Sequence, residues 1–214
     1  MRSTQAQTFL DVDPPKGQFY RVKVAHELPE LFFRTRSEWN RWLSANGTSS
    51  SGVWLRLAKR DSGIASLSYQ DALERALCHG WVDGQKKSLD DEFWLQRFTP
   101  RGPRSIWSKL NRKKAADLMA SGQMTPAGLA AVQSAQADGR WQRAYESQHS
   151  ARVPADLAAA LRANPGAQRF FAALDSRNRY AILFRLHQAV KAETRRRRLS
   201  KFVAMLAMGG KIYP

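Results

Sequence analysis

The stretch that decides the fold is residues 68–111, SYQDALERALCHGWVDGQKKSLDDEFWLQRFTPRGPRSIWSKLN. Its first ten residues place apolar side chains at the spacing of one buried helical stripe. Ser68 stands in front of this stripe as a good N-cap, and Gly80 supplies the left-handed residue with which many helices end. We therefore predict a helix between these two residues and place the other elements around it.

Two strands and a second helix are expected in the rest of the stretch. Residues 81–84 predict a short strand and a turn, and residues 92–98 predict a longer strand. Ser105 is a candidate N-cap for a helix that runs to about Ala120. The alternation of helix and strand predicts a sheet with helices packed on it.

The residues before this stretch predict three more strands and one helix. A short strand is expected at residues 31–33, and a helix begins at Ser37 and ends at Gly47. Residues 53–58 alternate between apolar and mixed positions, as in a strand with one face in the core. Residues 64–67 are predicted to return as its hairpin partner.

The residues after it predict helices alone. Pro126 is suited to the first turn of a helix that extends to Ala137, and residues 141–153 form a connection. The four helices expected beyond the connection are Ala155–Ala163, Gly166–Leu174, Arg177–Val190 and Thr194–Met208.

These elements predict an α+β fold, with a small antiparallel sheet and packed helices followed by a helical C-terminal half. We expect residues 1–27 to be a partly disordered N-terminal extension, because they show little apolar periodicity. Residues 28–140 are expected to form the α+β core. Residues 141–214 should form a helical region that packs on this core.

The composition indicates an attraction to anions. The formal charge is +17 and the calculated pI is near 10.8, so the summed field favours polyanions and anionic surfaces. The alternative is a basic protein that is merely soluble. The single cysteine, Cys78, excludes an internal disulfide, and no secretory signal is present at the N-terminus, so we expect a cytoplasmic protein.

Several sequence blocks together resemble the YdeI/OmpD-associated family, also called the bacteriocin-protection family. The resemblance extends from Leu28 to Pro214, and it implies a role in tolerance of envelope stress or cationic peptides without a settled reaction or ligand. The blocks that carry it are ALCHGWVDGQKKSLDDEFWLQRFTPRGPRSIWSKLN (76–111), GQMTPAGLAAV (122–132), ADGRW (137–141), VPADLAAAL (153–161) and AETRRRR (192–198).

One group of side chains suggests an anion site. Guanidinium groups, hydroxyls and free backbone N–H groups around the start of a helix favour a phosphate or carboxylate. The alternative is that these arginines cap structure and pair with acids. The residues are Arg97, Arg101, Arg104, Ser105, Ser108, Lys109 and Asn111.

A second group suggests a basic surface that follows a phosphate backbone. By helical phase, Arg195 and Arg196 flank an apolar stripe, so that they need anionic partners, and Asp83 is our candidate partner. The outward residues proposed for the surface are Arg112, Lys113, Arg197, Arg198 and Lys201.

Candidate pocket residues are Trp81, Asp83, Trp107 and Arg195. For Asp83 the alternative is a tight turn in which the carboxylate bonds local backbone N–H groups. Cys78 and His79 are adjacent on a helix and do not face each other, which favours a buried thiol over a nucleophile or metal site. We expect no metal and no cofactor.

Three functions remain open at this point. The first is a non-enzymatic protein whose basic surface binds an anionic partner such as nucleic acid. The second is an enzyme or binder for a small anionic or phosphate-bearing metabolite at the arginine site. The third is a protein-interaction module, which a large exposed apolar patch would indicate.

Overall fold

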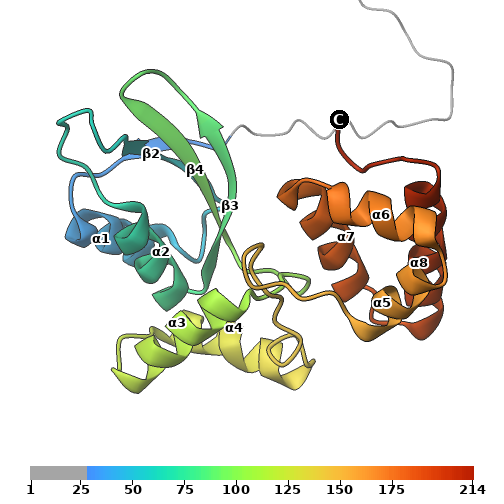
Figure 1. Ribbon diagram of the computed structural model, residues 1–214. Helices are drawn as coiled ribbons and strands as arrows, with labels where there is room; N and C mark the ends of the chain where they lie inside the picture. Colours follow the sequence, from blue (N-terminus) through green and yellow to red (C-terminus); the bar gives the residue numbers. More distant parts are fainter. Residues whose placement is uncertain (1–27) are drawn as a thin grey trace, which may run out of the picture.

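A computed structural model describes residues 28–214 of the chain, so the predicted N-terminal extension lies outside the described residues. Figure 1 shows a sheet with helices, followed by a bundle of helices. The strands are β1 (Glu30–Phe32), β2 (Val53–Ala58), β3 (Trp81–Ser88) and β4 (Phe93–Pro100). The helices are α1 (Arg36–Asn46), α2 (Tyr69–Cys78), α3 (Lys109–Ala120), α4 (Pro126–Ala137), α5 (Ala155–Arg162), α6 (Pro165–Ala173), α7 (Ser176–His187) and α8 (Ala192–Ala207).

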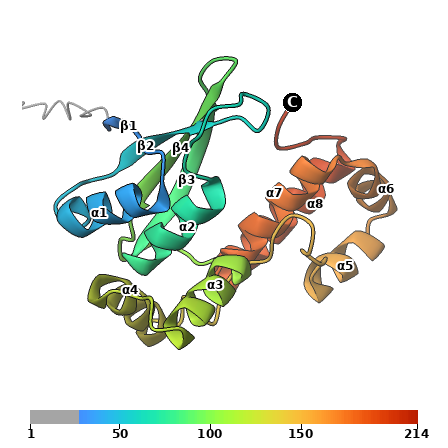
Figure 2. The same ribbon diagram turned by 90° about the vertical axis from the view of Figure 1, so that its left-hand side faces the viewer.

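The predicted α+β class is confirmed, and the sheet is mixed where we expected an antiparallel one. The strand order is β1-β2-β4-β3, with β1 parallel to β2 and both other pairs antiparallel. The parallel pair arises because α1 carries the chain from the end of β1 back to the start of β2. α1 and α2 cover one face of the sheet (Figures 1 and 2).

The predicted strand at residues 64–67 is wrong. These residues form a loop, because β2 already lies between β1 and β4 and has no free edge. The Ser66 hydroxyl instead accepts from the Ala58 N–H at 3.0 Å, and the Leu67 N–H donates to the Phe33 carbonyl at 3.0 Å.

Two predicted helix starts are also wrong. α1 is capped by Thr35, whose side chain and that of Glu38 form a reciprocal capping box, so Ser37 already lies inside the helix. α3 is capped by Ser108, whose hydroxyl accepts from the Asn111 N–H at 3.0 Å. Ser105 lies in the preceding loop, where its hydroxyl accepts from the Gly102 N–H.

The buried side chains form two clusters, whereas we expected the helical region to pack on the core of the first part of the chain. The α/β unit (residues 28–137) is centred on large rings, with Trp39, Trp81 and Trp107 each no more than 1% exposed. The helical unit (residues 155–214) has a smaller and mostly aliphatic cluster that includes Leu157 and Leu206, both 0% exposed. Among residues 28–214, no helix has both the length and the apolar character needed to cross a lipid bilayer.

The connector (residues 138–154) joins the two units through Tyr145. The Tyr145 N–H donates to the Trp107 carbonyl at 2.9 Å, and its carbonyl accepts from the Lys109 N–H at 2.8 Å. On the other side its ring meets Phe184 of α7 edge-on, at 5.0 Å between centroids. The Tyr180 hydroxyl, also on α7, donates to the Glu146 carbonyl. The connector is therefore bonded to both units.

Candidate functional site

A polar cluster lies where β3, the end of β4 and the start of α3 meet. We call it the Asp83–Arg101 cluster; its members are Tyr69, Asp83, Arg101, Trp107, Ser108, Asn111 and Tyr145. Three of the seven predicted anion-site residues, Arg101, Ser108 and Asn111, thus come together with two of the pocket candidates, Asp83 and Trp107.

Asp83 is the acceptor at the centre of this cluster. The Tyr69 hydroxyl, at the start of α2, donates to its Oδ2 at 2.8 Å. The Asn111 side chain, in the first turn of α3, donates to its Oδ1 at 3.2 Å. Both oxygens of the carboxylate are therefore held by side chains from helices far away in the sequence. The alternative, in which Asp83 only closes a local turn, does not describe this geometry.

Arg101 is the least satisfied residue of the cluster. Its guanidinium carbon lies 3.5 Å from the centroid of the Trp107 ring, and Nη1 donates to the Ile106 carbonyl at 3.1 Å. Its Nε and Nη2 are buried and have no hydrogen-bond partner in the described part of the chain, and the same holds for Nε1 of Trp107. Each unused buried donor costs about 1–3 kcal/mol. The cluster can therefore accommodate an acceptor, such as a water, a carboxylate or a phosphate oxygen.

The charge states in the cluster suit binding. Burial lowers the pKa of Arg101 to about 10, against the opposing influence of Asp83 and Tyr145. Burial, followed by the charge of Asp83, raises the pKa of both Tyr69 and Tyr145. At neutral pH the guanidinium is charged and both phenols keep their protons. These three groups therefore act as hydrogen-bond donors and not as proton shuttles.

An open groove of about 450 Å³ runs beside the cluster. Arg101 and Arg140 contribute positive charge to its lining, and none of the described residues that line it is Asp or Glu. His79 also lines it, hydrogen-bonds Asn40 at 3.1 Å, and has a pKa lowered mainly by burial. Small residues of α4 form one wall, namely Ala127, Ala130, Ala131 and Ser134.

The other predicted anion-site residues lie outside the cluster. Arg97 is on β4, and its Nε is buried with no hydrogen-bond partner among residues 28–214. Arg104 is exposed in the loop before α3. Lys109 forms an ion pair with Glu146 of the connector. α3 begins at Lys109 and not near Ser105, so the N–H groups of its first turn follow Ser108 in the chain and not Ser105.

The predicted basic surface divides between two helices. On α3, Arg112 donates to the Trp141 carbonyl and Lys113 pairs with Asp117, so both are engaged within the protein. On α8, Arg197 and Lys201 are exposed, whereas Arg198 is half-buried and donates to the Arg185 carbonyl.

Arg195 does not pair with Asp83 as we hypothesised. It forms a two-pronged ion pair with Asp156 of α5, with nitrogen–oxygen distances of 2.6 and 2.9 Å, because α8 packs within the helical unit. Arg196, which we expected to face inward, is exposed. Trp81 is 0% exposed and belongs to the core, yet it also lines the groove beside the cluster, and its indole N–H donates to the Gly47 carbonyl.

Sequence reasoning missed Tyr69 and Tyr145 as members of the cluster. Tyr69 fits the apolar stripe of α2, and Tyr145 lies in a segment that shows no periodicity. The available signal is that tyrosine hydroxyls are seldom buried without a polar partner. Within residues 28–214, no three His, Cys, Asp or Glu side chains gather in a way that could hold a metal ion.

Comparison with known families divides the chain at the connector. Residues 150–209 match the family described as bacteriocin-protection, YdeI or OmpD-associated, which confirms the resemblance for this part of the chain. Residues 31–131 match a different family, described as a domain of unknown function (DUF8412). No curated protein and no solved structure matches the chain.

Proposed function

We propose, from the premise that residues 150–209 carry a bacteriocin-protection domain, that the protein is a non-enzymatic cytoplasmic factor that binds an anionic polymer. The partner is nucleic acid, and binding serves tolerance of envelope stress or cationic peptides. One observation carries the proposal: the helical unit holds twelve Lys and Arg against three Asp and Glu in residues 155–214.

Within residues 28–214, most of the positive charge has no acidic partner. Residues 28–214 contain 31 Lys and Arg, and ion pairs engage six of them. Counting partners among the described residues, Arg195 is the one cation of the helical unit that forms an ion pair, and nine of the twelve cations are exposed. Like charges at this density repel each other, and a phosphate backbone relieves the repulsion while releasing its counterions.

The exposed side of α8 is the clearest part of this surface. Arg196, Arg197 and Lys201 are exposed there, and no ion pair involves them within the described chain. The cations of α3 provide a contrast, since Lys109, Lys113 and Lys114 all have a carboxylate within 4 Å. The two helices therefore offer matched sets of three cations, free on α8 and engaged on α3.

The test replaces each set by serine and measures binding of a labelled DNA duplex at several salt concentrations. Replacement of Arg196, Arg197 and Lys201 should weaken binding about tenfold or more, and should reduce the slope of log K against log salt by about 2–3. Replacement of Lys109, Lys113 and Lys114 changes the net charge equally and should have a much smaller effect. Equal losses in both variants, or no binding of DNA or RNA at low salt, would contradict the proposal.

A second function is favoured by the unused donors of Arg101 and Trp107. They suit a small carboxylate or phosphate-bearing ligand that the Asp83–Arg101 cluster binds. Inorganic phosphate and acetate are suitable probes, with the midpoint of thermal unfolding as the readout. Phosphate or acetate should raise this midpoint in the wild type and raise it less in Arg101→Met. If each anion raises the unfolding midpoint of the wild type and of Arg101→Met equally, the cluster holds water and not a ligand.

A further inference from the structure

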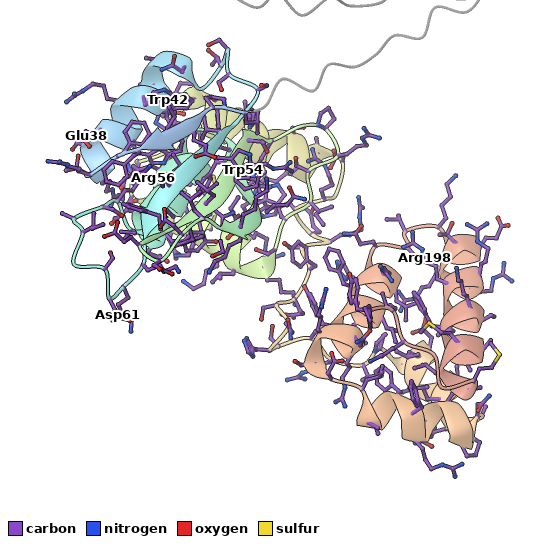
Figure 3. The ribbon with its side chains drawn as sticks, turned by 90° about the horizontal axis from the view of Figure 1, so that it is seen from above. Glu38, Trp42, Trp54, Arg56, Asp61 and Arg198 are labelled. Carbon is purple, nitrogen blue, oxygen red and sulfur yellow. The ribbon has the colours of Figure 1, made fainter. Side chains whose placement is uncertain are left out.

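The sheet has a second face that the helices leave open. Val53, Leu55 and Leu57 of β2 point into the core under α1 and α2, so Trp54 and Arg56 point to the opposite face. Register places Trp54 beside Arg97 of β4. No helix among the described residues covers this open face (Figures 1 and 2). Figure 3 labels Trp54 and Arg56 along β2.

Aromatic rings and cations alternate on this open face. The Arg56 guanidinium carbon lies 4.3 Å from the centroid of the Phe93 ring and 5.7 Å from that of Phe32. Phe32 and Phe93 contact each other edge-on at 5.8 Å. The Lys87 ammonium lies 4.2 Å from the centroid of the Trp54 ring. Phe32 is 36% exposed, so part of this ring system faces solvent.

The charge of the open face is positive. Arg56, Lys87 and Arg97 lie on it, and within the described chain none of the three has a carboxylate within 4 Å. Glu30, beside Trp54 in the register, is an acid on this face. A cation that lies over an aromatic ring stabilises the ring surface and also remains available to an anion.

We infer that this open face binds single-stranded nucleic acid, with bases stacked on Trp54 and Phe32 and phosphates held by Arg56, Lys87 and Arg97. The inference rests on the proposed function, because it specifies which form of nucleic acid the protein binds and which surface binds it. Bases of a single strand are free to stack on aromatic rings and guanidinium planes, whereas those of a duplex are already stacked. A duplex therefore has only its backbone to offer to the cations.

Residues 1–27 are a competing occupant, because they precede β1 in the chain. They carry four Lys and Arg against three Asp and Glu. A nearly neutral segment does not complement a positive face, whereas a phosphate backbone does. If these residues do cover the face, mutation of Trp54 should leave binding of nucleic acid by the full chain unchanged.

The experiment compares Trp54→Ala with Trp94→Ala in the full chain. Trp94 is a close control, since it is also half-buried and has a lysine, Lys86, 4.3 Å above its ring, but it lies on the helix-covered face. The probes are a labelled thymidine dodecamer and a DNA duplex of equal length, measured by fluorescence anisotropy at fixed salt. Trp54→Ala should weaken binding of the dodecamer about tenfold and leave duplex binding within about twofold.

Two further variants separate stacking from misfolding. Trp54→Phe keeps an aromatic ring and should recover most of the affinity for the dodecamer. Trp94→Ala should bind both probes like the wild type. Unchanged dodecamer binding in Trp54→Ala, or an equal loss for dodecamer and duplex, overturns the inference. If the variant that replaces Arg196, Arg197 and Lys201 loses duplex binding while Trp54→Ala still binds the dodecamer normally, the proposed function stands and this inference fails. Absence of any binding by the wild type would remove both.

Discussion

The α/β unit and the helical unit differ in the source of their stability and in their charge. The α/β unit buries four large rings, Trp39, Trp81, Phe98 and Trp107, each no more than 1% exposed. Its 110 residues contain sixteen Lys and Arg against ten Asp and Glu. The helical unit buries mainly leucine and isoleucine, and its 60 residues contain twelve Lys and Arg against three Asp and Glu.

This difference teaches that the unit with the smaller core carries the larger charge density. Self-repulsion destabilises a compact state, and a small aliphatic core has less apolar area to offset it. A charge excess of this size is therefore unfavourable for folding alone. Under the proposed function, a bound polyanion would offset this repulsion.

The largest expected effect tests whether the two cores are separate. Trp81→Ala should lower the free energy of unfolding of the α/β unit by about 4 kcal/mol, because it removes a fully buried ring from the aromatic cluster. Urea denaturation followed by hydrogen exchange of individual peptides gives the measurement. Peptides of α5–α8 should keep their protection. If they lose protection together with β2 and β4, the two units unfold as one and the comparison fails.

A smaller effect concerns the ion pair between Asp156 and Arg195. The hydrogen bonds from Arg195 hold the pKa of Asp156 below its ordinary value. Because the folded-state pKa is depressed, the stabilisation is present above the unfolded pKa of about 3.9 and is lost as the pH falls through the folded value. Asp156→Asn should therefore cost about 0.5–1 kcal/mol at pH 7, since both side chains are partly exposed.

Urea denaturation at pH 7 and at successively lower pH measures this ion pair. The gap between wild type and Asp156→Asn should shrink below about pH 4. Asp117→Asn is the control from the other unit, because its pair with Lys113 is between residues i and i+4 and is more exposed. It should change stability less at every pH. A gap for Asp156→Asn that persists unchanged at low pH would contradict the assigned cause.

The smallest expected effect is that of salt on the two units. Added sodium chloride screens repulsion between exposed like charges, so it should stabilise the helical unit more than the α/β unit. Hydrogen exchange at about 0.05 and about 0.5 M salt, between which the Debye length falls from above about 10 Å to below about 8 Å, compares the two units within one molecule. Equal responses in α7 and β4 would show that the excess charge does not strain the helical unit.

Local patterns were enough to predict much of the fold. α4 begins at Pro126 and ends shortly before Gly139, as predicted. Ser68 precedes α2 and Gly80 follows it, also as predicted. The four C-terminal helices lie within a few residues of their expected positions. Each of these depends on caps and on apolar spacing within one segment, which a single sequence displays.

The remaining features depend on contacts between distant segments. The parallel pairing of β1 with β2 follows from the path of α1, and the sequence of neither strand contains a pattern that indicates it. The partner of Arg195 is Asp156, 39 residues away, and nothing local distinguishes it from Asp83. The phenols of Tyr69 and Tyr145 join one cluster only after the connector folds back on α3.

The connector has a consequence for modular evolution. The two family matches end at residue 131 and begin at residue 150, so most of the connector belongs to neither. Yet Tyr145 of the connector forms backbone hydrogen bonds with the α/β unit, and its ring contacts Phe184 of the helical unit. A recombination event at either end of the connector would separate Tyr145 from one of the two units that it contacts. Transfer of this arrangement into another protein therefore requires the connector to be inherited together with both units.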